Sequence, residues 1–353
     1  MIRISITKPV FMLFLISSSL ISQSYWVKYG WQIFESAGDA RSRSLGSAVI
    51  ADQGGTVAAL YNPASINMNT KHNLHYTHQS RLGGMINSDL FGIPLKNFKR
   101  PFNLILLYEG IDKIPDTRNM LLDFGLDGIP GTGDVGEGNG QVDEGERLDK
   151  DKLTYFTQKQ TGIHLSTSWK KKNYSYGLAI KSLFHNLGEF SSTGVGLDLG
   201  LIANLWNDGK LGLLAKDITT SWQIWNNGTV ERFKPVFVAG ISQRHSLNNL
   251  KLKLIGSIDF KWDTNGSKGL FKSLDPNNTY VMLGLHIKYS ERVALRFGQN
   301  QTRSTTFGLG LIWSNVSLDY AFIAEPINSG LGSTHLISMS LNSNLILEYI
   351  DKL

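Results

Sequence analysis

The chain has 353 residues, 36 glycines, no cysteine and a formal net charge of +6. The lack of cysteine excludes disulfides and thiolate chemistry. Hydrophobic residues make up 41% of the chain, and no apolar run after residue 25 approaches the ~20 residues that a membrane helix needs. A membrane barrel fits this composition, because its strands are only half apolar.

Residues 1–24 have the pattern of a secretory signal peptide. Arg3 and Lys8 supply its positive start, residues 10–16 its apolar core, and Ser22 and Ser24 its small residues for cleavage. The alternative is an anchor helix that stays attached, but the apolar run is short for a membrane span. In front of a barrel, a cleaved signal predicts the outer membrane of a Gram-negative-type bacterium.

Residues 71–341 alternate between apolar and polar side chains, in short stretches separated by turns and loops. In residues 250–262, for example, the even positions are mainly apolar and the odd positions mainly polar. A strand points successive side chains to opposite faces, so this period of two predicts strands. About fourteen strands are predicted, an even number as in single-chain bacterial barrels. They centre on Leu74, Phe91, Leu106, Ile163, Gly177, Leu199, Leu213, Val238, Leu254, Leu283, Leu295, Leu309, Leu318 and Ile337.

The connections between these strands alternate between short turns and mostly longer loops. Asn207-Asp208-Gly209-Lys210 has strong turn chemistry, whereas residues 111–151 form a long connection. Outer-membrane barrels have short periplasmic turns and longer outer loops, so the alternation predicts a closed antiparallel barrel with both termini on the periplasmic side. A soluble β-sandwich is the alternative, because strand spacing alone does not separate the two.

Charged residues within the strands indicate which face points inward. Arg or Lys on the lipid face costs about 2–4 kcal/mol at mid-depth, so charges mark the lumen. The charges assigned to the lumen are Asp198, Asp259, Asp319, Arg292 and Arg296. Four tryptophans, Trp169, Trp206, Trp262 and Trp313, are all expected at the turn-side ends of strands, where an interfacial aromatic girdle belongs.

The long connection from Asp112 to Asp151 carries eleven acidic and four basic side chains, a net charge of −7. Asp123 to Asp134 partly matches a calcium loop, with Asp127 at position 5 and Gly128 at position 6, although position 3 is Gly125. A solvated disordered loop is the alternative. The candidate calcium ligands are Asp123, Asp127, Asp134, Asp143 and Glu146.

Both ends of the predicted barrel carry motifs found together in one family. The first group is Ala40, Arg41, Leu45, Gly46, Ala48 and Ala58, followed by Asn62, Pro63 and Ala64; the second is residues 318–322 (LDYAF) with 332–335 (GSTH). The chain here resembles the PorV/PorQ family of outer-membrane proteins, relatives of the FadL-type fatty-acid transporters.

The resemblance implies that residues 25–70 fold into the lumen as a hatch. Its candidate residues are Arg41, Leu45, Gly46, Asn62, Pro63 and Ala64. Arg41 and Arg43 are expected to pair with lumen carboxylates such as Asp198, Asp259 or Asp319. The alternative is a periplasmic arm that only precedes the barrel. Residues 342–353 form a C-terminal tail.

The resemblance implies a role in type IX protein secretion or surface attachment, by binding secreted cargo or secretion-system subunits. The alternative is a FadL-like transporter of hydrophobic small molecules. No catalytic constellation or phosphate loop occurs in the sequence, so an enzyme is not predicted. Nucleic-acid binding is not predicted either, because aromatic stacking motifs are absent. Outer-membrane lipid is the expected surrounding, and no cofactor is predicted apart from possible Ca²⁺.

Overall fold

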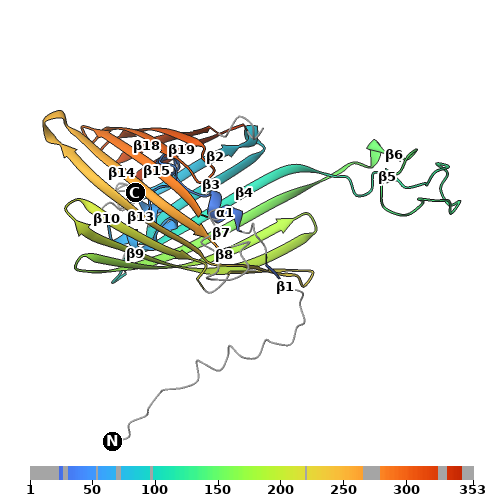
Figure 1. The fold of residues 1–353 in the computed structure, drawn as a ribbon, viewed down its shortest axis with the longest axis horizontal. Coiled ribbons are helices and arrows are strands. Elements are labelled where there is room, and N and C mark those ends of the chain that lie inside the picture. The colour runs from blue at the N-terminus through green and yellow to red at the C-terminus, as the bar shows by residue number, and fades with distance from the viewer. Residues whose placement is uncertain are drawn as a thin grey trace, which may run out of the picture.

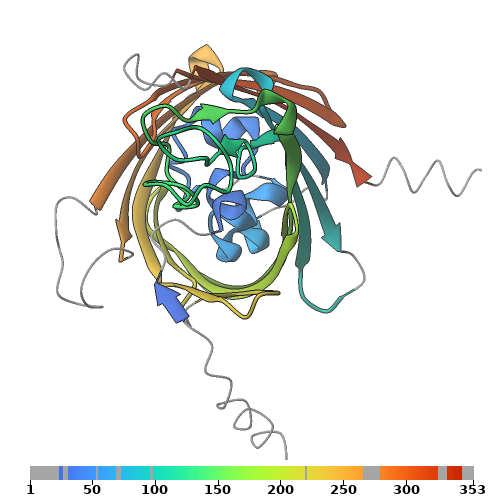
Figure 2. The ribbon, with the colours of Figure 1, turned by 90° about the vertical axis from the view of Figure 1, so that its right-hand side faces the viewer.

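The computed structural model describes residues 24–26, 31–52, 55–68, 73–95, 98–218, 221–264, 279–324 and 332–343. They form an antiparallel barrel with short helices inside it (Figures 1 and 2). No helix in these ranges is long and apolar enough to cross a membrane.

The wall strands follow one another in chain order around the barrel. Their bounds are β2 (Asn73–Arg81), β3 (Ile86–Leu95), β4 (Phe102–Asp116), β7 (Thr154–Lys171), β8 (Tyr174–Leu187), β9 (Phe190–Trp206), β10 (Gly209–Lys216), β11 (Ser221–Trp225), β12 (Val230–Phe233), β13 (Val236–Leu247), β14 (Leu252–Asp263), β15 (Thr279–Tyr289), β16 (Val293–Gln299), β17 (Thr305–Ile312), β18 (Val316–Ala324) and β19 (Ser333–Asn342).

Pairing of the last strand with the first closes the sheet, with His335 opposite Ser80 and Asn342 opposite Asn73. β10 and β11 both pair with β9 and together make one interrupted wall strand. β12 and β13 continue each other in the same way, against β11 and β10. Counted so, the described residues form a closed barrel of 14 strands. A short strand, β1 (Ser24–Trp26), adds to β12 in parallel.

The predicted barrel is confirmed, and each of the fourteen predicted strand centres lies in a different wall strand. Side chains on β14 show why the alternation predicted the strands correctly. Ile258 and Phe260 are exposed on the outside, whereas Ser257, Asp259 and Lys261 are buried inside. The outward belt of apolar side chains is what lipid requires of a membrane barrel. A soluble sandwich would bury that face instead.

Turns and loops also sort as predicted, with a two-residue turn at Asn207-Asp208 between β9 and β10. We call the barrel end that carries the longest loop the outer end. Trp169, Trp206 and Trp313 lie at the opposite end, but Trp262 lies near the outer end of β14. The predicted turn-side position is therefore confirmed for three of the tryptophans and wrong for Trp262, because β14 runs from the turn at its start to the outer end.

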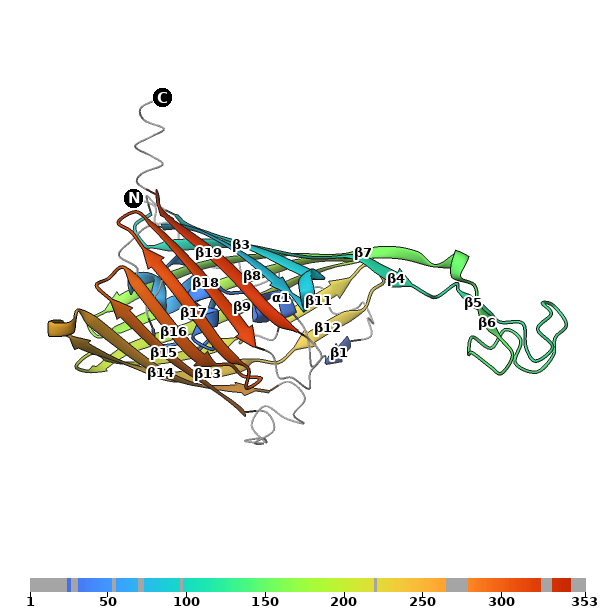
Figure 3. The same ribbon diagram turned by 90° about the horizontal axis from the view of Figure 1, so that it is seen from above.

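The long acidic connection begins later than the sequence suggested, at residue 117 instead of 112. β4 and β7 continue their pairing to Asp116 and Thr154, so the hairpin projects far beyond the barrel (Figure 3). A small hairpin of β5 (Leu121–Leu122) and β6 (Arg147–Leu148), and the turn η4 (Lys150–Lys152), lie in the loop beyond it. Two further short helical turns, η3 (Leu82–Gly84) and η5 (Asn248–Leu250), connect wall strands.

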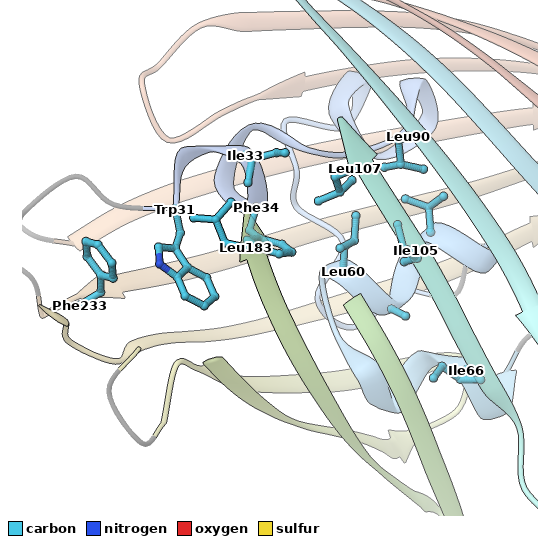
Figure 4. Close-up of a cluster of buried hydrophobic side chains, with 12 residues drawn as sticks. Trp31, Ile33, Phe34, Leu60, Ile66, Leu90, Ile105, Leu107, Leu183 and Phe233 are labelled. Carbon is cyan, nitrogen blue, oxygen red and sulfur yellow. The ribbon is translucent and has the colours of Figure 1, made fainter. Parts of the chain in front are cut away.

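The hatch (residues 31–68) lies inside the barrel, as Figure 2 shows. It contains α1 (Gln32–Ser36), α2 (Ala40–Ser44), η1 (Thr56–Leu60) and η2 (Pro63–Met68). Apolar hatch side chains such as Phe34 and Leu60 form a buried cluster with wall residues including Ile105 and Leu183 (Figure 4). The prediction of a plugged lumen is therefore confirmed over the described part of the hatch. The predicted signal peptide lies outside the described residues except for Ser24, and the tail is described only to residue 343.

Candidate functional site: a cavity between the hatch and the barrel wall

A cavity of about 410 Å³ lies between the hatch and the wall. Its walls come from α1, α2 and the chain that follows them, from β2, β10, β13, β14 and β15, and from the loop between β16 and β17. That loop, which contributes Asn300, Gln301 and Thr302, connects strands at the outer end. The cavity therefore lies in the outer half of the barrel.

One side of the cavity is apolar. Ile50 of the hatch and Leu214, Val238 and Met282 of the wall line it and belong to one buried hydrophobic cluster. The three wall side chains come from β10, β13 and β15, and β14 lies between the last two. The apolar side can therefore hold a nonpolar body.

The other side of the cavity carries charge. Glu35 of α1 lies between two wall lysines, with its Oε1 atom 3.1 Å from Lys216 Nζ and its Oε2 atom 2.5 Å from Lys261 Nζ. Burial alone would raise the pKa of Glu35, but the two ammonium groups lower it well below its ordinary value. The carboxylate is therefore held as an anion that joins α1 to β10 and β14.

Polar atoms without partners also line the cavity. Within the described residues, Arg43 Nε and Asp259 Oδ1 make no hydrogen bond. Burial raises the pKa of Tyr61, another lining residue, to about 12, so its hydroxyl keeps its proton at neutral pH. The cavity thus offers an apolar wall, several donors and one free carboxylate oxygen.

Asn62 of the Asn-Pro-Ala motif bonds the hatch to the barrel wall. Asn62 Nδ2 lies 3.0 Å from the carbonyl oxygen of Ile50, 3.2 Å from that of Leu201 and 3.3 Å from that of Leu213. Asn62 Oδ1 accepts a hydrogen bond from Ala64 N at 3.0 Å. One buried side chain therefore ties the hatch to itself, to β9 and to β10.

Wall glycines let the hatch backbone approach this closely. A Cβ atom added at Gly177 would lie 2.1 Å from Ala64 N and the carbonyl carbon of Pro63, and one at Gly212 would lie 2.3 Å from Ile50 O. The same holds at Gly298, where the added atom would lie 2.4 Å from Gly46 N. A side chain at any of these three wall positions would clash with the hatch backbone. The glycines are therefore needed for residues 44–64 to lie against the wall.

The other hatch candidates also lie where the hatch meets the barrel wall. Leu45 is buried, and Gly46, with φ near 63°, donates from its N–H to Thr306 Oγ1 at 3.0 Å. Arg41 pairs with Asp52 of the hatch itself. Arg41 therefore lies within pairing reach of a carboxylate, as expected, but the carboxylate is that of Asp52 in the hatch and not that of Asp198, Asp259 or Asp319 on the wall.

Four of the five predicted lumen charges have a partner inside the barrel, and Arg292 does not lie there. Arg296 is 2% exposed and its Nη1 atom lies 2.7 Å from Asp319 Oδ1, while Asp259 Oδ2 accepts from Ile50 N at 2.9 Å. Asp198 lies 2.9 Å from Lys181 Nζ. Arg292 was misplaced, since it is exposed in the turn before β16.

Sequence reasoning missed Glu35, Lys216, Lys261 and Lys181. Lys216 and Lys261 are inward positions of their strands, so the alternation alone could have placed them in the lumen. Glu35 carries no such signal, because its helix of five residues is too short to show a helical period.

Four of the five candidate calcium ligands accept hydrogen bonds from backbone N–H groups of the acidic loop. Asp123 accepts from Gly138 N and Gly140 N, both at 2.7 Å, and Glu146 accepts from Gly125 N at 3.1 Å and Asp143 N at 2.9 Å. The N–H of Gly140 is the main cause that lowers the pKa of Asp123. Asp127 and Asp134 accept from other backbone N–H groups of the loop, and Asp143 accepts from a side-chain amide. Across the part of the chain that is described, no three acidic or histidine side chains converge to hold a metal ion.

Calcium binding therefore stays a prediction, and it requires the loop carboxylates to be drawn together. We expect calcium to slow proteolysis within residues 117–153, because a bound cation would offset the repulsion between these carboxylates. Limited proteolysis of the folded barrel with calcium or with chelator measures this. Asp134→Asn should remove the protection, and identical cleavage patterns with and without calcium would leave the loop as a set of capped turns.

No family model matches the sequence, and no curated protein matches it significantly. Solved structures share the fold. The toluene transporter TbuX of Ralstonia pickettii matches with a TM-score of 0.52 and 11% identity, covering 87% of this chain and 98% of that one. A ΔS2S3 mutant of the monoaromatic hydrocarbon channel TodX matches with a TM-score of 0.50 and 12% identity, covering 87% and 99%. The chain therefore shares the fold of these two proteins, and its own 14-strand barrel encloses the N-terminal segment.

Proposed function

We propose that the protein is an outer-membrane channel that admits small, partly apolar molecules from the outside and releases them past the hatch. The observation that carries this proposal is the cavity of about 410 Å³ in the outer half of the lumen, with its apolar side at Ile50, Leu214, Val238 and Met282. Its size is typical of small-molecule sites, which range over ~300–1,000 Å³.

The outer surface of the barrel supports a location in the outer membrane. Lipid-facing side chains such as Phe260, Leu283 and Phe297 are large, apolar and exposed, which suits a hydrocarbon surrounding and would favour aggregation in water. The fold shared with a toluene transporter and a hydrocarbon channel supports a transport role over a catalytic one. Removal of the signal peptide before insertion is part of the same proposal.

Uptake by whole cells tests the channel. A Gram-negative host without its own hydrocarbon channels would express the protein, and the initial rate of radiolabelled toluene uptake would be compared with that of cells carrying an empty vector. We expect a several-fold faster rate, because the outer leaflet slows the entry of apolar molecules. Met282→Arg, which fills the apolar side with a charge, should lower the rate to the control level. Equal rates in all three strains would reject the proposal.

The projecting hairpin favours a second function, contact with an extracellular protein, as the resemblance to the PorV/PorQ family implied. The hairpin carries the acidic loop well beyond the barrel (Figure 3), with Val135 and Val142 exposed at 77% and 66%. Replacement of residues 119–151 by a short turn tests this function. A secretion role predicts loss of surface-attached proteins from the native host, whereas a channel role predicts unchanged toluene uptake.

A further inference from the structure

Glu35 occupies the position that a ligand carboxylate would take. Its two oxygens meet two different lysines, from strands separated by β13 in the sheet. The exposed fraction is 14% for the Lys216 side chain, 10% for Lys261 and 27% for Glu35. The carboxylate is thus the most accessible of the three groups, and the lysines are the fixed part of the site.

Both lysines are anchored in the wall, whereas Glu35 is on a helix of five residues. β10 and β14 each pair with β13 along their length, so the two ammonium groups have a rigid base. α1 instead packs through Trp31, Ile33 and Phe34 onto the wall. Movement of α1 can therefore remove the anion and leave the two cations in place.

The charges around the cavity favour an anion. The charged lining residues comprise four cations, Arg43, Arg81, Lys216 and Lys261, and two anions, Glu35 and Asp259. Arg81 pairs with Glu109, which does not line the cavity, but no ion pair of Arg43 occurs in the described residues. If Glu35 moved away, two buried ammonium groups would lose their counter-charge, and burying an unpaired charge is costly. A ligand carboxylate removes that cost.

We propose that Lys216 and Lys261 form a carboxylate-binding site that Glu35 occupies in the closed channel, and that a small organic carboxylate displaces Glu35. The carboxylate group of the ligand lies between the lysines, and its apolar body lies against Leu214, Val238 and Met282. Displacement frees α1 from the wall at β10 and β14. This inference rests on the proposed channel function and adds to it a ligand class and the contact that the ligand breaks.

Benzoate and toluene are the matched probes, because they share a ring and differ in the carboxylate. Titration calorimetry on the purified full-length barrel measures benzoate binding. We expect Glu35→Gln to bind benzoate about tenfold more tightly than the wild type, a change that corresponds to about 1.4 kcal/mol. Lys216→Met and Lys261→Met should each weaken binding about tenfold or more, since each removes a charge-assisted hydrogen bond.

Single-channel recording in planar bilayers provides the second readout. Benzoate should raise the open probability of the wild type, whereas Glu35→Gln should open frequently without benzoate. Glu189→Gln, an equal charge change at an exposed position outside the lumen, should behave as the wild type. Heat-modifiable migration on gels shows that each variant is folded, and the two lysine variants test the site even if Glu35→Gln does not fold.

The outcomes separate this inference from the channel proposal. Toluene uptake with equal benzoate affinity in the wild type and all three site variants would reject the carboxylate site and leave the channel standing. Benzoate binding that depends on the lysines, without toluene uptake, would reject the apolar channel and keep the site. Benzoate binding without any change in open probability would reject the role of Glu35 in closure.

Discussion

Deletion of residues 31–64 should convert the closed barrel into an open pore. The hatch fills the lumen and is held there by buried contacts such as Asn62 to β9 and β10. The wall behind it is largely polar, with Ser338, Thr306 and Asp259 facing inward, so water can replace the hatch once it is gone. We expect a steady conductance typical of open pores, measured in planar bilayers, where the intact protein should show only rare openings.

A loop deletion is the matched control for the hatch deletion. Removal of residues 119–151 takes away a similar length of chain from outside the barrel and should leave conductance unchanged. If the barrel without its hatch stayed closed, the outer loops and not the hatch would be the barrier. That result would also contradict the role assigned to Glu35.

Lys181→Met should cause the largest loss of stability among single substitutions in the wall. The Lys181 side chain is 3% exposed, and its Nζ atom lies 2.9 Å from Asp198 Oδ1 and 2.7 Å from Asp217 Oδ1. The same ammonium group lies 5.4 Å from the ring centroid of Trp31 in the hatch. Removing it leaves two buried carboxylates without a cation, and breaking a buried pair costs about 3–5 kcal/mol. Guanidinium unfolding of the barrel in lipid vesicles measures the change.

Two further variants separate charge from packing. Adding Asp198→Asn and Asp217→Asn to Lys181→Met should restore most of the lost stability, because no buried charge then remains unpaired. Lys253→Met removes a pair with Glu291 whose side chains are 47% and 54% exposed, and we expect a loss of at most about 1 kcal/mol. Equal losses for Lys181→Met and Lys253→Met would show that the buried network has no special weight.

The strands of the barrel were readable from the sequence because their signal is local. Lipid outside and polar side chains inside impose a period of two on every strand, as Ile258, Asp259 and Phe260 illustrate. The sequence placed the start of the acidic loop too early because the prediction depended on this alternation. Beyond the membrane both faces of β4 meet water, so the alternation ends before the pairing with β7 does.

The cavity was not readable in the same way. Its key contacts join Glu35 to Lys216, 181 residues away, and to Lys261, 226 residues away. Separations this long follow no strand or helix period, and a charge in a short helix has many possible partners. The sequence therefore could not predict which lysines Glu35 contacts. Arg41 shows the same difficulty, since the predicted lumen carboxylates were reasonable partners but Asp52 lies nearer.

The amino-acid sequence by itself determined a fourteen-strand barrel, its inward and outward faces, and a small-residue segment that fits inside it. These follow from the period of strands and from the size of side chains, which depend on neighbours in the chain. Only the tertiary structure decided where the hatch touches the wall, which glycines receive its backbone, and which lysines hold Glu35. Those contacts depend on how the closed sheet positions distant strands around the hatch, and barrel closure is a property of the whole chain.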